Sequence, residues 1–179
     1  MANPNITLGE RVVLFADVHD YSTISHVLGV DSYSFLQEMY ETLGDIVVAH
    51  DGAIVKYLGD ALLCVFPAGT ENEAVDCALK LRQAFAQIVR RRGLSVETEL
   101  EIGISSGQVA SGTFGHRSRL QWDVLGEEVN RAATIGHHRG IAITGCVHDQ
   151  FKSNRPVRRL PDFNLKGQTE PLNVWEVVE

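Results

Sequence analysis

The chain has 179 residues, a length that suits one domain and allows most of its apolar surface to be buried. Hydrophobic residues make up 44% and charged residues 22% of it, with no low-complexity tract, which argues against a disordered protein. The net charge of −7 argues against nucleic-acid binding, because that function usually needs a basic face. We therefore expect a single globular domain over residues 1–179 with no nucleic-acid partner.

The sequence also indicates where the protein resides. No apolar run approaches the length of about 18 residues that a membrane helix needs, and residues 1–6 lack the pattern of a signal peptide. The three cysteines, Cys64, Cys77 and Cys146, are odd in number and lack metal-ligand spacing, which is typical of a reducing compartment. We expect a cytoplasmic chain without a membrane segment, either on its own or as the cytoplasmic domain of a larger protein.

Strand and helix signals alternate along the chain. In order, we expect a buried strand at 11–18, a loop, a helix at 31–50, hairpin strands at 53–58 and 61–66, a helix at 71–91, strands at 99–107 and 120–124, a helix from 126 to about 138, a strand at 141–144 and a short helix ending near 151. The tail from Val157 to Glu179 predicts two or three strands around Gly167. The order βαββαβ, followed by further α/β elements, predicts an α+β fold with a ferredoxin-like core, in which one mixed sheet packs against helices.

Two aspartates stand at the ends of apolar strands. Asp17 follows the run 12–16, and Asp60 lies in the turn between the two hairpin strands. If these strands pair in one sheet, both carboxylates emerge at the same edge and form an oxygen-rich site for Mg²⁺ or Mn²⁺, with phosphates as further ligands. Each aspartate taken singly is also explained as a turn residue, since Asp is common in turns.

Three segments together resemble a known family. They are Phe-Ala-Asp-Val-His-Asp-Tyr-Ser at 15–22, Lys-Tyr-Leu-Gly-Asp at 56–60, and Gly-Ile-Ser-Ser-Gly at 103–107, which leads on to 123–133. In their order and spacing they resemble the catalytic domain of the class III nucleotidyl cyclases, the family of adenylyl and guanylyl cyclases. The resemblance runs from about Arg11 to the end of the chain.

The resemblance implies a two-metal reaction on a nucleotide. Asp17 and Asp60 would hold two divalent cations, Mg²⁺ or Mn²⁺, with help from the backbone carbonyl of Val18. The ribose 3′-hydroxyl of ATP would attack the α-phosphate, releasing pyrophosphate and forming 3′,5′-cyclic AMP. The implied phosphate contacts are backbone N–H groups between Val18 and Ser22, near a helix start, together with Tyr21, Ser22 and Lys166.

The same resemblance implies how the base and the ribose are held. Lys56 and Asp123 match the positions that recognise adenine, whose edge offers ring-nitrogen acceptors and an amino donor, and Asn130 matches the residue that orients the ribose. Guanine has the opposite donor and acceptor pattern, so ATP is favoured over GTP. Without the resemblance, Lys56 is explained as a solvent-facing strand residue, Asp123 as a strand-end residue and Asn130 as an exposed helical residue.

The chain departs from the family at the transition-state arginine. The family helix carries an arginine four residues after the asparagine, where this chain has Thr134. Arg131 follows Asn130 directly and lies about 100° around the helix, so it cannot take that place. Arg139, or His138 one turn further along the same helical face, are the candidates to replace the missing charge.

A second departure is Asp20, which stands where the family generally has glycine in the loop that receives phosphates. The leading interpretation is an adenylyl cyclase that acts as a head-to-tail homodimer, with its sites at the subunit interface. The alternative is a catalytically weak or inactive cyclase-homology domain that serves as a nucleotide-binding, dimerisation or regulatory module. Cyclisation of another nucleotide is a more remote alternative.

Overall fold

The structure is a computed structural model that describes residues 6–165 and 170–178. Its elements are β1 (Thr7–Val18), α1 (Tyr21–Leu28), the 3₁₀ turn η1 (Gly29–Asp31), α2 (Ser32–Ala49), β2 (Ala53–Leu58), β3 (Ala61–Pro67), α3 (Glu71–Arg91), β4 (Leu100–His116), β5 (Arg119–Leu125), α4 (Glu127–Ile135), β6 (Ile141–Thr144), α5 (Gly145–Gln150), β7 (Val157–Arg159) and β8 (Val174–Val177). None of the helices described is long and apolar enough to cross a membrane.

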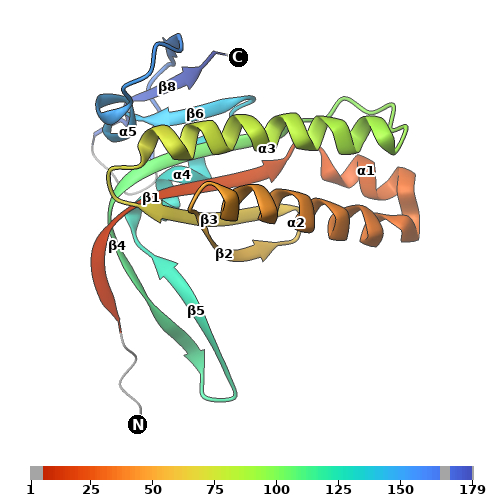
Figure 1. Cartoon of the computed structure of the whole chain (residues 1–179), viewed down its shortest axis with the longest axis horizontal. Coiled ribbons are helices and arrows are strands. Elements are labelled where there is room, and N and C mark those ends of the chain that lie inside the picture. Colours follow the sequence, from red (N-terminus) through yellow and green to blue (C-terminus); the bar gives the residue numbers. More distant parts are fainter. Residues whose placement is uncertain (1–5, 166–169, 179) are drawn as a thin grey trace.

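All strands belong to one mixed sheet, as Figure 1 shows. The strand order is β2-β3-β1-β4-β6-β8-β7, and β5 pairs with β4 outside this path. The strands β1 to β4 pair antiparallel, and β4 pairs with β6 in parallel. The predicted α+β fold with a βαββαβ core is confirmed.

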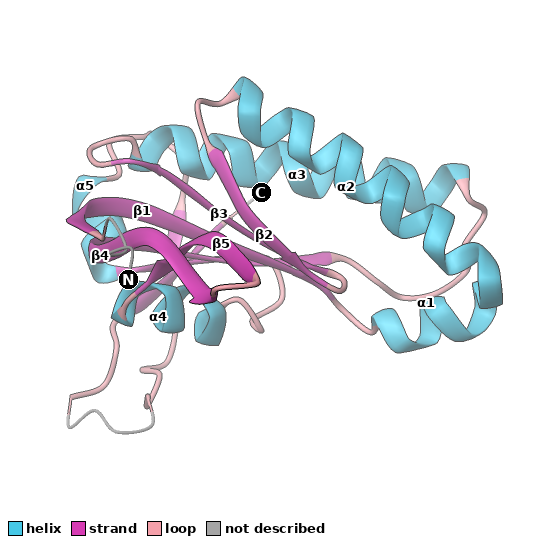
Figure 2. Ribbon diagram, turned by 90° about the horizontal axis from the view of Figure 1, so that it is seen from below, coloured by secondary structure: helices cyan, strands magenta, loops and turns pink. Residues whose placement is uncertain are grey.

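The helices cover the sheet unequally. α2 and α3 lie along one face, and α4 lies on the other face (Figure 2). Along β1 the side chains of Val12, Leu14 and Ala16 enter the large core under α2 and α3, whereas Val13 and Phe15 belong to a smaller cluster that includes Ala132 of α4. Because side chains alternate along a strand, Asp17 lies on the α4 face.

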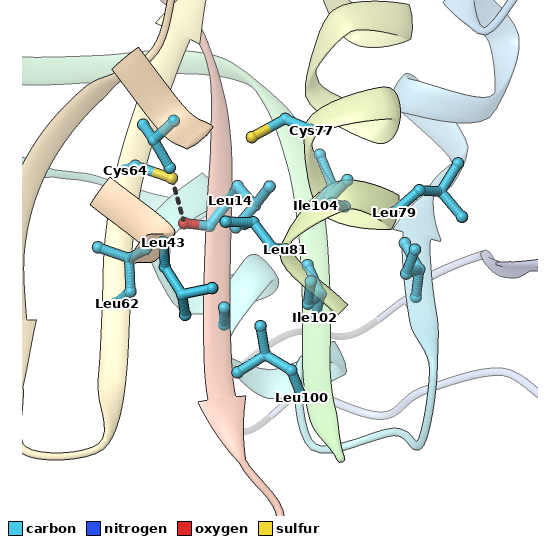
Figure 3. Packing of buried hydrophobic residues seen from close by; sticks show 14 of the residues in the cluster. Leu14, Leu43, Leu62, Cys64, Cys77, Leu79, Leu81, Leu100, Ile102 and Ile104 are labelled. Atoms are coloured by element: carbon cyan, nitrogen blue, oxygen red, sulfur yellow. Dashed lines mark hydrogen bonds between the residues drawn. The ribbon is translucent and has the colours of Figure 1, made fainter. Parts of the chain in front are cut away.

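The large core is built mainly from aliphatic side chains of the central strands and α3 (Figure 3). Leu14, Leu81 and Ile104 are fully buried there. The Cys64 thiol donates a hydrogen bond to the Leu14 carbonyl at 3.8 Å, and burial raises its pKa well above the usual range. Burial also raises the pKa of the Cys77 thiol to about 12, so both cysteines behave as small apolar core residues.

Several element boundaries differ from the sequence expectation. Residues 21–28, expected as a loop, form helix α1, which buries only one side chain, that of Ile24. β4 extends to His116 instead of ending near Gly107, because its second half forms a long arm with β5. In the tail, β7 and β8 are present and Phe163 bridges to Leu172.

Helix α4 ends at Ile135, three residues before the expected end at His138. At this end the helix lies against β4, where a Cβ atom built on Gly103 would lie 2.0 Å from the Ala132 carbonyl oxygen and 2.6 Å from the Gly136 nitrogen. The backbones of helix and strand therefore touch without an intervening side chain. Since His138 lies beyond the helix, it does not continue the face of Asn130 and Thr134.

Replacing Gly103 by alanine should lower the free energy of unfolding by about 2–4 kcal/mol, because the added methyl group forces α4 away from β4. Urea denaturation measures this loss. Gly9→Ala on β1 is the control, since the nearest atom to its added Cβ is Arg11 Nη1 at 3.8 Å. Equal losses in the two variants would show that the close approach of α4 does not require the glycine.

Candidate active site

The two predicted metal ligands meet at one edge of the sheet. Asp17 precedes the last residue of β1, and Asp60 lies in the turn between β2 and β3. β3 pairs with β1 in the register Ala16 to Leu62, which places the turn beside the end of β1. The carboxyl groups of Asp17 and Asp60 lie within hydrogen-bonding reach of each other.

Burial raises the pKa of both carboxyl groups. For Asp17 the nearby His137 opposes this shift, and the charge of Glu101 adds to it. For Asp60 the charge of Asp17 adds to the effect of burial. The pair therefore carries unfavourable negative charge at neutral pH unless a cation is bound between its members.

The donor set fits a hard divalent cation. Asp17 and Asp60 offer only oxygen atoms, and the carbonyl of Val18 adjoins them at the end of β1. Among the residues that the structure describes, no group of three or more His, Cys, Asp or Glu side chains is arranged to hold a metal. Further ligands would therefore come from the backbone and from phosphate oxygens, as is usual for Mg²⁺ in nucleotide enzymes.

The loop after β1 leads directly into helix α1. Tyr21 and Ser22 lie in its first turn, and their N–H groups can face an anion, whereas the Thr23 N–H donates to the Asp20 carbonyl at 3.1 Å. The Tyr21 ring stacks on Phe35 at 6.5 Å. Asp20 has a left-handed backbone with φ of 54° and accepts a hydrogen bond from the Ser22 hydroxyl at 3.0 Å. Hydrogen bonds from Thr23 and Ser22 lower the pKa of Asp20, so this carboxylate is ionised and turned toward its own helix.

The predicted base-recognition pair is in direct contact. Lys56 Nζ of β2 lies 2.7 Å from Asp123 Oδ2 of β5, and both side chains are about one-fifth exposed. Asp123 also accepts a hydrogen bond from the backbone N–H of Val124 at 2.8 Å. Within the described ranges, no hydrogen bond or ion pair joins this pair to Asp17 or Asp60. The chain thus carries two groups that do not contact each other, one acidic and one formed by a lysine and an aspartate.

Helix α4 presents the predicted ribose residue and the position of the missing arginine. Asn130 is exposed, and the Thr134 hydroxyl donates to the Asn130 carbonyl at 2.8 Å, which leaves no cation at this position. Arg131 binds the buried Glu128 at 2.8 Å on another side of the helix. Arg139, a candidate to replace the missing charge, is bound to Glu97 at 2.6 Å.

His138 and Lys166 are the remaining predicted residues. The His138 ring points toward Glu176, with 3.9 Å between Nε2 and Oε1, and Lys166 lies outside the described residues. Two residues beside the acidic pair were not predicted. Glu101 of β4 lies opposite Asp17 of β1 in the strand register. His137 Nδ1 lies 3.7 Å from Asp17 Oδ2.

Comparison with known proteins decides the family. Residues 7–176 match the family model of the adenylate and guanylate cyclase catalytic domain. The chain belongs to this family. Its relatives include adenylate cyclase 1 of Rhizobium meliloti, with 28% identity over 94% of this chain, and an adenylate cyclase of Anabaena cylindrica, with 29% identity over 92%. The chain spans only 27% and 36% of the length of these two relatives.

Solved cyclase structures share the fold of this cyclase domain. The adenylyl cyclase CyaB from P. aeruginosa superposes with a TM-score of 0.89, covering 98% of this chain and 96% of that protein at 22% identity. The guanylyl cyclase Cya2 superposes with a TM-score of 0.84, covering 96% and 92% at 23% identity. Adenylyl and guanylyl cyclases are therefore both close in fold, and the fold does not distinguish between their substrates.

Replacing Asp60 by asparagine should raise the melting temperature of the metal-free protein by a few degrees at pH 8. Because the pKa values of Asp17 and Asp60 are raised by folding, the folded protein binds these protons more tightly than the unfolded chain does. The contribution of the two groups to stability therefore falls as the pH rises through their folded-state pKa values. Asp60→Asn removes this cost, and the gain should shrink at low pH.

Thermal melts with and without Mn²⁺ measure the effect. The stabilisation of the wild-type protein by Mn²⁺ should be lost in Asp60→Asn and kept in the control Asp149→Asn, whose side chain is 76% exposed. Equal stabilisation of all three proteins by Mn²⁺ would contradict a metal site at Asp60.

Proposed function

We propose that this domain is an adenylyl cyclase that converts ATP to 3′,5′-cyclic AMP and pyrophosphate. The observation that carries the proposal is the 2.7 Å contact between Lys56 and Asp123, which come from different strands and form one donor and acceptor pair. Adenine offers a ring-nitrogen acceptor beside an amino donor, and a lysine beside an aspartate complements that edge. The opposite pattern of guanine favours ATP over GTP.

The proposed catalytic half consists of Asp17, Asp60 and the carbonyl of Val18, which would hold two Mg²⁺ or Mn²⁺ ions. Bound cations would neutralise the triphosphate and activate the ribose 3′-hydroxyl. The chain itself would hold the two carboxylates at one sheet edge and offer the N–H groups of Tyr21 and Ser22 to the phosphates. A contact from Lys166 to the phosphates remains a prediction.

A head-to-tail homodimer would bring the two groups together. Within one chain, the acidic pair and the Lys56–Asp123 pair do not contact each other. The resemblance to the cyclase family implies that a nucleotide held by one chain's carboxylates would meet the partner's base-recognition pair and ribose-orienting asparagine. Exposed apolar side chains of β5 support such an assembly: Leu120, Trp122 and Leu125 are each more than 40% exposed on the arm that extends from the sheet (Figure 1).

One observation favours the second candidate, a catalytically weak or inactive module that binds nucleotide or mediates dimerisation. Thr134 offers no positive charge to the transferring phosphoryl group, and its hydroxyl is bound to its own helix. The loss of an arginine in such a position costs about 10³-fold in rate in other phosphoryl-transfer enzymes. The proposed cyclase is therefore expected to be slow.

An assay of the purified protein with ATP or GTP, in the presence of Mn²⁺ or Mg²⁺, tests the proposed activity. We expect cyclic AMP from ATP, much less cyclic GMP from GTP, and no product from Asp60→Ala. Absence of product with either metal, from protein shown to be dimeric and to bind ATP, would support the binding module instead. Cyclic GMP as the main product would contradict the proposed role of Lys56 and Asp123.

Restoring the arginine should increase turnover. Thr134→Arg places a guanidinium one turn after Asn130, and we expect kcat to rise at least about 10-fold with little change in KM. Thr134→Val is the control, since it removes only a hydroxyl bound within the helix and should leave kcat within about threefold. An unchanged kcat in Thr134→Arg would mean that another residue supplies the charge.

A further inference from the structure

A network of polar contacts lies next to Asp17 of the proposed metal site, because Glu101 is opposite Asp17 in the β1–β4 register. His19 Nδ1 is 2.8 Å from Glu101 Oε1, and the Glu101 side chain is only 8% exposed. On the other side of the ring, His19 Nε2 lies 2.8 Å from Arg139 Nη2. Arg139 is in turn anchored by Glu97 at 2.6 Å. The side chains of His19, Glu101 and Arg139 come from the loop after β1, from β4 and from the loop after α4.

The direction of these hydrogen bonds follows from the chemistry of arginine. A guanidinium can only donate, so His19 Nε2 accepts from Arg139. The ring proton then lies on Nδ1 and is donated to Glu101. Both ring nitrogens are therefore used, which fixes the orientation of the imidazole.

The backbone of His19 is held by the same region. Its N–H donates to the Glu99 carbonyl at 2.9 Å, and its carbonyl accepts from the Thr98 hydroxyl at 2.6 Å. The side chain and both backbone groups of His19 are thus bound to residues 98–101. The neighbours of His19 are Val18 on one side and the left-handed Asp20 on the other.

We propose that Glu101, acting through His19, is a positioning residue for the phosphate-receiving loop at residues 17–22. This inference rests on the proposed cyclase function. Fixing His19 sets the direction in which the Val18 carbonyl, the Asp17 carboxylate and the first turn of α1 face the nucleotide. The contact with Arg139 also ties this loop to the segment that follows α4 in the same chain, which restrains the loop from a second side.

Glu101 is not arranged as a third metal ligand. Its Oε1 accepts from His19, and in the described part of the chain no three acidic, histidine or cysteine side chains form a metal-binding group. A positioning role predicts that the acceptor atom of residue 101 matters more than its charge. The substitution Glu101→Gln would keep that acceptor, whereas Glu101→Ala would remove it.

The first test follows amide hydrogen exchange of residues 17–23 in the metal-free protein. In Glu101→Ala and His19→Ala, exchange in this segment should accelerate at least about 10-fold, and Glu101→Gln should remain within about threefold of the wild type. Arg139→Ala should accelerate exchange by an intermediate factor, because it removes only one of the two contacts of the His19 ring. This variant is expected to fold, since the Arg139 side chain is half exposed. Glu38→Ala is the control, because it breaks the ion pairs that Glu38 of α2 forms with Arg91 and Arg92 at the C-terminal end of α3.

The second test measures cyclic AMP formation. Glu101→Ala and His19→Ala should lower kcat about 10- to 100-fold with KM for ATP changed less than about threefold, and Glu101→Gln should restore most of the loss. If the wild-type protein makes no cyclic AMP, the proposed function fails, and the exchange measurement still decides the positioning role. Unchanged exchange in both alanine variants would overturn the proposal, as would a Glu101→Gln variant as impaired as Glu101→Ala.

Discussion

The pairing of β1 with β4 is the constraint on which the rest of the site depends. The two strands run antiparallel from the Thr7–Ser111 pair to the Val18–Leu100 pair. This register places Asp17 opposite Glu101 and Phe15 opposite Gly103, the residue that lets α4 contact the sheet. One strand pair therefore determines both where the Asp17 carboxylate emerges and how closely helix α4, which carries Asn130, approaches the sheet.

The electrostatics of the site follow from how each carboxylate is paired. Glu101 is bound by His19, and Asp20 is turned toward the Ser22 hydroxyl of α1. Asp17 and Asp60 instead face each other, and burial raises the pKa of both. Such a pair lowers the stability of the folded protein in the absence of a cation, and binding a cation would raise it. Functional sites often lower stability in this way.

Part of the fold and site could be predicted because it depends on local patterns. Apolar runs marked the strands beside Asp17 and Asp60, and the resemblance to the cyclase family singled out Lys56 and Asp123 as a pair. Helix α1 was missed because it buries only one side chain, which leaves a weak periodic signal. The role of Glu101 could not be predicted, since it depends on the register of two strands more than 80 residues apart and on contacts with His19.

The central claim is that each site combines the acidic pair of one chain with the base-recognition pair of its partner. Mixing Asp60→Ala with Lys56→Ala after subunit exchange tests it most directly, because a mixed dimer would contain one site without either change. The account predicts that two inactive variants together recover about one quarter of wild-type cyclic AMP formation, since half of the dimers are mixed and each has one intact site. A mixture that stays as inactive as its components, although mixed dimers are shown to form, would contradict it.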